Sequence, residues 1–265
     1  MANLDATVMQ DGQDAALPRI RTITTQDLRD ALRRGWEDFK AKPSHLVFIA
    51  LIYPVAGVLL AQLTVSYNIF PLLFPLLGGF ALLGPFAAIG LYEISRRREL
   101  GLDSRWPQAL DVLRSPSIGQ ICLLGAMLTG LFIGWLFSAW FIYRGLLGLP
   151  ADVTTADFLR AVFTTFDGWV MIVVGNSVGL LFAILAFSIS VISFPLIIDR
   201  HVDAPTAIRT SIAAVEANPR VMMQWGLMVT GLLVLGCLPV LVGLVVVMPV
   251  LGHATWHLYR KVVER

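Results

Sequence analysis

The sequence predicts an all-α membrane protein, a polytopic bundle of about six transmembrane helices in three hairpins with short amphipathic helices at the membrane surface. Its mean hydropathy is +0.74 and only 14% of its 265 residues are charged, whereas soluble domains carry about 25%. Several apolar runs reach the roughly 20 residues that a helix needs to cross a bilayer. In addition, a six-span arrangement places 18 of the 20 Lys and Arg residues on one side of the membrane, as the positive-inside rule requires.

The chain divides into a short tail and one membrane domain. Residues 1–22 are poor in large apolar side chains and rich in Asp, Gln and Ala, which predicts a disordered tail without a cleavable signal peptide. Residues 23–265 are predicted to form a single transmembrane domain. Its spans are expected at about 46–66, 69–92, 118–143, 169–198, 221–238 and 239–259.

An amphipathic helix is expected before the first span. Its apolar face consists of Leu28, Ala31, Leu32, Trp36 and Phe39. Its charged face consists of Arg29, Asp30, Arg33, Arg34, Glu37, Asp38 and Lys40. Thr24 and Asp27 have the spacing of a capping box, and Pro43 is expected to end the helix. The helix is therefore predicted to lie at the lipid headgroups.

The order of apolar face, proline and apolar run recurs twice more. Pro116 follows Ala109, Val112 and Leu113, and Pro219 follows Ile208, Ile212 and Val215. The pattern predicts a threefold repeat of amphipathic helix, proline and membrane hairpin. A separate amphipathic helix, capped by Thr154 and carrying Phe158, Leu159, Val162 and Phe166, is expected on the opposite surface.

Three spans carry further signals. Pro71, Pro75 and Pro85 predict kinks in the second span. Glycine pairs at GxxxG spacing, Gly130 with Gly134 and Gly175 with Gly179, predict close helix packing. The fourth span has 30 residues, or about 45 Å of helix, so it is expected to tilt or to protrude.

The basic residues set the expected orientation. They cluster in 1–45, 95–117, 199–220 and 260–265, which places both termini in the cytoplasm of a bacterial inner membrane. Aromatic residues are expected at the cytoplasmic border (Trp36, Trp106, Trp225, Trp256 and Tyr259) and at the other border (Tyr67, Trp140, Tyr143 and Trp169).

The sequence contains few candidate residues for catalysis, ion transport or ligand binding. No ionisable residue lies at mid-depth of a span, which argues against ion-coupled transport. No hydrolase, metalloprotease or nucleotide-binding motif is present, so no enzyme activity, cofactor or nucleic-acid partner is predicted. Cys122 and Cys237 lie in apolar runs and predict no disulfide. His253 and His257 share a helix face at i, i+4 spacing and are candidate metal or haem ligands.

Three functions are compatible with these observations. The first is a non-enzymatic accessory, assembly or scaffold protein that docks another membrane protein or anionic lipid through Arg29, Arg33, Arg34 and Trp36. The second is a channel or facilitator for a small uncharged solute, lined by Asn176 and by the serines of the fourth span, Ser188, Ser190 and Ser193. The third is a respiratory-chain-associated protein that binds haem or metal through the two histidines.

Two segments resemble a known family. ALRRGWEDFKAKPSHLVFIALIYPV (31–55) and LPVLVGLVVVMPVLGHATWHLYRKVV (238–263) are similar to the bacterial integral-membrane family known as domain of unknown function 2189. The resemblance implies a six-span inner-membrane protein of unassigned activity, and some members of the family carry a cytochrome c oxidase label. It implies no functional residues.

Overall fold

The computed structural model describes residues 18–41, 72–80, 84–150, 153–238 and 242–265, and these ranges are helical apart from turns and one isolated β-bridge. The all-α prediction is confirmed. In chain order the elements are α2 (Thr25–Ala41), α4 (Leu73–Phe80), α5 (Gly84–Ala87), α6 (Ile89–Glu99), the 3-10 helix η4 (Trp106–Arg114), α7 (Ile118–Leu146), α8 (Thr155–Thr164), α9 (Phe166–Ser190), α10 (Ser193–Arg200), α11 (Ala204–Ala217), α12 (Pro219–Cys237) and α13 (Leu244–Val262).

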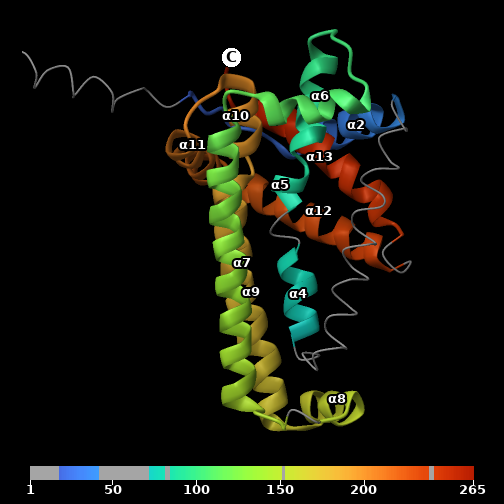
Figure 1. Cartoon of the computed structure of the whole chain (residues 1–265), viewed down its shortest axis with the longest axis vertical. Coiled ribbons are helices and arrows are strands. Elements are labelled where there is room, and N and C mark those ends of the chain that lie inside the picture. Colours follow the sequence, from blue (N-terminus) through green and yellow to red (C-terminus); the bar gives the residue numbers. More distant parts are fainter. Residues whose placement is uncertain (1–17, 42–71, 81–83, 151–152, 239–241) are drawn as a thin grey trace, which may run out of the picture.

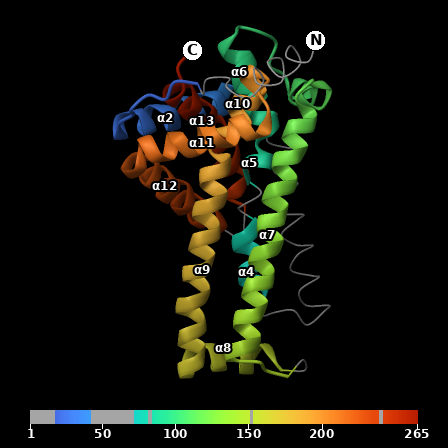
Figure 2. The same ribbon diagram turned by 90° about the vertical axis from the view of Figure 1, so that its left-hand side faces the viewer.

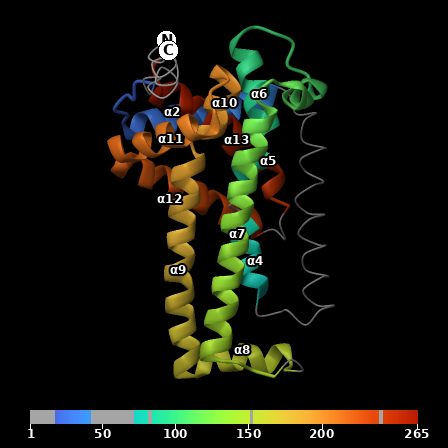
Figure 3. The ribbon, with the colours of Figure 1, turned by 60° about the vertical axis from the view of Figure 1, so that its left-hand side comes forward.

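Two long helices and a cluster of shorter ones shape the molecule. Helices α7 and α9 stand side by side, and α8 lies across one of their ends (Figure 1). At the other end α2, α6, α10, α11 and the end of α13 gather into what we call the polar cap (Figure 2). The oblique helix α12 begins at the cap and extends only part of the way along the α7–α9 pair (Figure 3). The main hydrophobic core lies at the capped end, where the largest buried side chains are Trp225, Trp256, Tyr92, Tyr259 and Phe194.

Three helices in the described ranges are long and apolar enough to cross a membrane. They are Ile118–Leu146, Phe166–Arg200 and Pro219–Cys237, and they correspond to the predicted spans 118–143, 169–198 and 221–238. The predicted span 46–66, together with Pro43, lies outside the described residues. The count of six spans therefore stays a prediction.

The remaining two predicted spans differ from single straight helices. In place of 69–92 the structure describes the helices α4, α5 and α6. Pro75 and Pro85 lie in the first turns of α4 and α5, where a proline is tolerated. Pro71 and the residues between α4 and α5 lie outside the described part of the chain, so the kinks stay a prediction. Helix α6 also continues beyond residue 92, because Glu93 pairs with Arg96 and Arg97 one turn later. In place of 239–259, helix α13 continues to Val262, and the part after residue 250 is largely buried in protein.

The fourth predicted span is interrupted by a helix break near its end. Helix α9 ends at Ser190, and α10 begins at Ser193 with Pro195 as its third residue. A proline there costs no hydrogen bond within α10, because the first N–H groups of a helix have no intrahelical acceptor. The backbone N–H of Ile192 at the break donates to Ser211 Oγ (3.2 Å). The buried helix α10 thus belongs to the polar cap.

Helix α2 packs against α13 through a face that differs from the predicted one. A Cβ atom on Gly35 would lie 2.7 Å from the Cβ atom of Ala254 and from the carbonyl oxygen of Val250, so only glycine permits this crossing. The buried residues of α2 are Leu28, Ala31, Gly35 and Asp38. The assignment of Asp38 to the exposed charged face is therefore wrong, whereas Trp36, a member of the predicted apolar face, is exposed.

The segment before α2 is tied to the other end of the chain. Residues 18–22 were expected to belong to a disordered tail, but Ile20 forms an antiparallel bridge with Val263. Asn218 adds a second attachment, since its Oδ1 accepts from the N–H of Ile23 (2.8 Å) and its Nδ2 donates to the carbonyl of Arg21 (3.0 Å). The rest of the predicted tail, residues 1–17, lies outside the described residues.

Helices α7 and α9 pack by aromatic rings over glycine. A Cβ atom on Gly179 would lie 2.9 Å from the ring of Trp135, and Phe182 lies beside Gly134 in the same way (3.4 Å). Among the residues that the structure describes, a Cβ atom on Gly130 or on Gly175, the other members of the two GxxxG pairs, would meet nothing within 4 Å. Within these residues, one glycine of each pair serves packing, and its neighbour is a ring rather than a second backbone.

The repeat and the caps are reproduced in part. The three expected amphipathic copies form α2, η4 and α11, so the second copy is a 3-10 helix rather than an α-helix. The N–H of Asp157 donates to Thr154 Oγ1 (3.1 Å), which confirms that predicted cap. One half of the predicted capping box at Thr24 forms, since the Thr24 N–H donates to Asp27 Oδ2 (2.9 Å), but the N–H of Asp27 donates to the carbonyl of Thr24 (3.0 Å) rather than to its hydroxyl.

The expected aromatic borders are only partly at the surface. Trp36, Trp140 and Trp169 are exposed. Four of the others, Tyr143, Trp225, Trp256 and Tyr259, are buried in protein instead of facing lipid. Tyr67 and the side chain of Trp106 lie outside the described part of the chain.

Candidate functional site

The carboxylate of Asp38 is the centre of a buried polar cluster between α2, α6 and α13. Ser95 Oγ donates to Asp38 Oδ2 (2.6 Å), and His257 Nε2 contacts the same oxygen (2.9 Å). Arg98 Nη1 lies 2.9 Å from Asp38 Oδ1. His253 Nδ1 contacts Ser95 Oγ (2.8 Å) behind the carboxylate. We call these five residues the Asp38 cluster.

The hydrogen bonds determine where the two imidazoles carry hydrogen. Ser95 has one hydroxyl hydrogen, which it donates to Asp38, so His253 Nδ1 must donate to Ser95 Oγ. A carboxylate only accepts, so His257 Nε2 must donate to Asp38. Ser95 is 1% exposed and lies between the carboxylate and an imidazole, whereas a hydrolytic triad places the histidine between an accessible serine and the acid.

Asp38 is held as the anion. Burial opposes ionisation, but the hydrogen bonds from His257 and Ser95 outweigh this cost and hold the pKa of Asp38 below its ordinary value. A buried carboxylate is costly unless cations and donors surround it, and the guanidinium of Arg98 provides the nearest full charge. The cluster therefore joins three helices around one satisfied negative charge.

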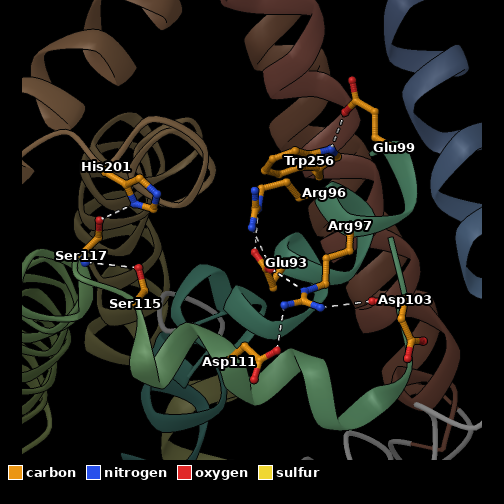
Figure 4. Close-up of polar contacts among 10 residues, drawn as sticks. All are labelled: Glu93, Arg96, Arg97, Glu99, Asp103, Asp111, Ser115, Ser117, His201 and Trp256. Carbon is orange, nitrogen blue, oxygen red and sulfur yellow. Dashed lines mark hydrogen bonds and ion pairs between the residues drawn. The ribbon is translucent and has the colours of Figure 1, made fainter. Parts of the chain in front are cut away.

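A second network fixes the loop after α6. Figure 4 shows that the carboxylate of the buried Glu93 accepts hydrogen bonds from Arg96 and Arg97. Arg96 Nε donates to Glu93 Oε2 and Arg97 Nε donates to Glu93 Oε1, each at 2.8 Å. Arg97 then reaches Asp111 of η4 (2.8 Å) and the carbonyl of Asp103 (3.2 Å). Arg97, the middle residue of the triple arginine after the second predicted span, thus anchors η4 against α6.

A third network ties the C-terminal end to α2, α6 and α10. Glu99 accepts from the indole of Trp256 (3.2 Å, Figure 4) and from Arg260 (3.1 Å). Arg260 also reaches Asp199 (3.0 Å). Lys261 Nζ lies 3.0 Å from a carboxylate oxygen of Asp27. Burial opposes the charge of Glu99, but Arg260 outweighs it and lowers the pKa of that carboxyl.

A groove opens on the cap beside these networks. Its volume is about 560 Å³, within the roughly 300–1,000 Å³ typical of ligand sites. We call it the basic groove. Its lining is Arg33, Arg34, Glu37, Asp38, Ser95, Arg98, Glu99, His257, Arg260, Lys261 and Arg265. Six of these residues carry full positive charge and three carry negative charge.

The structure brings some of the predicted site residues together and separates others. Arg33, Arg34 and His257 line the basic groove. Arg29 and Trp36 lie on the exposed face of α2, outside the groove lining. Asp38, Ser95 and Arg98 were not predicted as site residues, because nothing in local periodicity indicates that α6 lies beside α2.

The histidine pair gains no support as a metal or haem site. One nitrogen of each imidazole is used in a hydrogen bond to Ser95 or Asp38. Within the described ranges no group of three or more His, Cys, Asp or Glu side chains is placed to hold a metal ion.

Polar side chains of the fourth predicted span form hydrogen bonds with backbone carbonyls of their own helix. Asn176 Nδ2 donates to the carbonyl of Ile172 (2.7 Å), and Ser190 Oγ donates to the carbonyl of Ala186 (2.7 Å). Ser193 bonds the carbonyl of Ile189 in the same i−4 pattern. These contacts give no support to a solute path lined by these residues.

Comparison with known proteins finds one family match, which covers the middle of the chain. Residues 72–199 match the family described as predicted integral membrane protein, DUF2189. This match confirms the predicted family. The segments 31–55 and 238–263, on which the resemblance was based, lie outside the matched residues. No curated protein and no solved structure matches the chain. The DUF2189 description gives membrane integration and no activity.

Proposed function

We propose that this protein is a non-enzymatic accessory, assembly or scaffold component of the bacterial inner membrane that docks a partner membrane protein through its polar cap. The observation that carries the proposal is an exposed stripe on α2, opposite the face that packs on α13. Arg29, Arg33, Trp36 and Lys40 follow one another at i, i+4, i+7 and i+11, and all four are exposed. Lys40 Nζ lies 5.9 Å from the ring centroid of Trp36. Tryptophan and arginine are the residues most enriched in interaction hot spots.

Further observations favour a docking role over catalysis. The Asp38 cluster encloses its serine, and its hydrogen bonds join helices rather than leaving a reactive group exposed. The ionisable residues of α7, α9 and α12 lie at helix ends: Arg144, Asp167 and Arg220. A scaffold needs a rigid base for its docking surface, and the three ion networks supply one.

The proposal includes an orientation with both termini in the cytoplasm. This orientation is supported by the bridge between Ile20 and Val263, which joins the two described ends of the chain. The basic residues gather in the polar cap at that side, which supports a cytoplasmic cap by the positive-inside rule. In this orientation α8 lies on the periplasmic surface.

The test is purification of the tagged chain at native expression in mild detergent, followed by mass spectrometry. We expect one membrane protein to co-purify at fixed stoichiometry. The double change Arg29→Gln and Trp36→Ala should lower its yield by at least tenfold, while Arg209→Gln on α11 should leave it unchanged. Recovery of the chain alone at native expression, or equal loss with the control, would contradict the proposal.

A further inference from the structure

We propose that the basic groove binds a phosphate-bearing ligand, with Arg34, Arg98 and Arg265 as the residues that contact it. The inference names a ligand class for the polar cap and so rests on the docking role proposed above. The groove lies between α2, α6 and the end of α13, and its charged lining carries more cations than carboxylates.

The carboxylates of the groove are already engaged. Asp38 is 8% exposed and is bound by Arg98, Ser95 and His257. Glu99 pairs with both Arg260 and Arg265. Glu37, the third carboxylate of the lining, pairs with Arg33 (2.9 Å). The negative charges are therefore screened by their partners, and an entering anion meets mainly guanidinium and ammonium groups.

The arginines keep donors for a ligand. Among the described residues, Arg98 contacts Asp38 and the carbonyl of Glu37, and both contacts use Nη1. In the described part of the chain, Arg34 pairs only through Nε and Arg265 only through Nη2. A guanidinium has five N–H donors in a planar fork, and several such forks around one cavity match the oxygens of a phosphate group.

The exposure of these side chains agrees with a binding role. The side chains of Arg34 and Arg265 are 53% and 78% exposed, so both can close on a ligand without unfolding the cap. Removal of these two side chains should also leave the fold intact, because Asp30 remains paired with Lys261 and Glu99 remains paired with Arg260. The same chemistry fits a lipid headgroup and a soluble phosphate ester.

The experiment uses the full chain purified in detergent in a phosphate-free buffer. Calorimetric titration with glycerol 3-phosphate tests the soluble source, and native mass spectrometry with added phosphatidylglycerol or phosphatidylcholine tests the lipid source. We expect saturable binding in at least one arm. For the lipid arm, phosphatidylglycerol should be retained in preference to phosphatidylcholine.

Variants make the test specific to the groove. Arg34→Gln combined with Arg265→Gln should weaken binding at least tenfold, and Arg34→Lys, which keeps the charge but not the fork, should weaken it less. Arg209→Gln, exposed on α11 outside the groove, should change affinity by less than twofold. Absence of binding in both arms, or an equal loss with Arg209→Gln, would overturn the inference.

The outcome separates this inference from the docking proposal. If a partner protein co-purifies but the groove binds neither probe, the docking proposal stands and the phosphate site is overturned. Phosphate binding by a chain that purifies alone supports the site and contradicts the docking of a partner protein.

Discussion

At the scale of single residues, the least expected feature is a buried carboxylate on an amphipathic helix. Asp38 occurs among charged neighbours, so periodicity assigns it to solvent. The structure buries it because α6 and α13 bring Ser95, Arg98 and His257 to it. A charge buried with this many partners is satisfied, whereas removal of one partner leaves the others uncompensated.

The ionisation of Asp38 should appear in the pH dependence of stability. Its pKa is lowered in the folded protein, so its contribution is complete above the ordinary value of about 3.9 and is lost as pH falls through the folded pKa. Asp38→Asn should lower the free energy of unfolding by about 1–3 kcal/mol at pH 7 and flatten its decline below about pH 4. Thermal unfolding in detergent from pH 7 to pH 3 measures both effects.

The control for that experiment is Glu216→Gln, which removes an exposed carboxyl on α11. It should leave both the stability at pH 7 and the acid slope close to those of the unchanged protein. A decline in acid as steep for Asp38→Asn as for the unchanged protein would show that this carboxyl is not the titrating group.

Two glycines of one helix give a matched test of packing. Gly179→Val should cost about 1–3 kcal/mol through overpacking, because its Cβ would lie 2.9 Å from Trp135. Gly175→Val makes the same chemical change at a position where a Cβ atom meets no described residue within 4 Å. Unfolding midpoints in detergent should fall for the first variant only. Equal midpoints would mean that Trp135 does not pack over Gly179.

At the scale of elements, the cap is held together by contacts between distant segments. The strand-like residues 19–23 lie between Asn218 and the end of α13, and α2 follows directly. The amide of Asn218 pairs with this segment as a neighbouring strand would, and so satisfies the backbone N–H of Ile23. This attachment sets where α2 begins its crossing of α13.

Loss of the Asn218 amide should loosen the start of the described chain. Asn218→Ala leaves the N–H of Ile23 without its acceptor, at a cost of about 1–3 kcal/mol. Hydrogen exchange of a peptide covering 18–25 should then accelerate by about tenfold or more. Asn176→Ala is the control, because that amide bonds only a carbonyl of its own helix. Unchanged exchange in Asn218→Ala would show that the β-bridge alone holds the segment.

At the scale of the whole molecule, the structure has a charged end and an end closed by α8. The described charges on α6, α11 and α13 lie at the capped end, and α8 lies across the far end of the α7–α9 pair (Figure 1). A chain built in this way has one surface suited to soluble partners and headgroups, and a long apolar body between the two ends.

The two ends should label from opposite sides of the membrane. In a background of Cys122→Ser and Cys237→Ser, Ala156→Cys on α8 should react with an impermeant maleimide added to intact cells. Arg209→Cys on α11 should react only after the cells are opened, and a reporter fused after Arg265 should be active only in the cytoplasm. Reaction of both cysteines in intact cells, or a periplasmic reporter signal, would refute the orientation.

The sequence by itself determined the membrane class, the α-helical architecture, the similarity to the family that residues 72–199 match, the cap at Thr154, and the positions of the three helices that qualify as spans. These properties depend on composition and on residues within a few turns of one another. The structure alone decided that Asp38 is buried, that Gly35 permits the α2–α13 crossing, and that Arg33, Arg34 and His257 share a groove. Helical periodicity distinguishes an apolar face from a polar one, but it carries no information on which distant helix covers that face. Burial of Asp38 depends on partners from α6 and α13, up to 219 positions along the chain, and only the packed molecule brings them together.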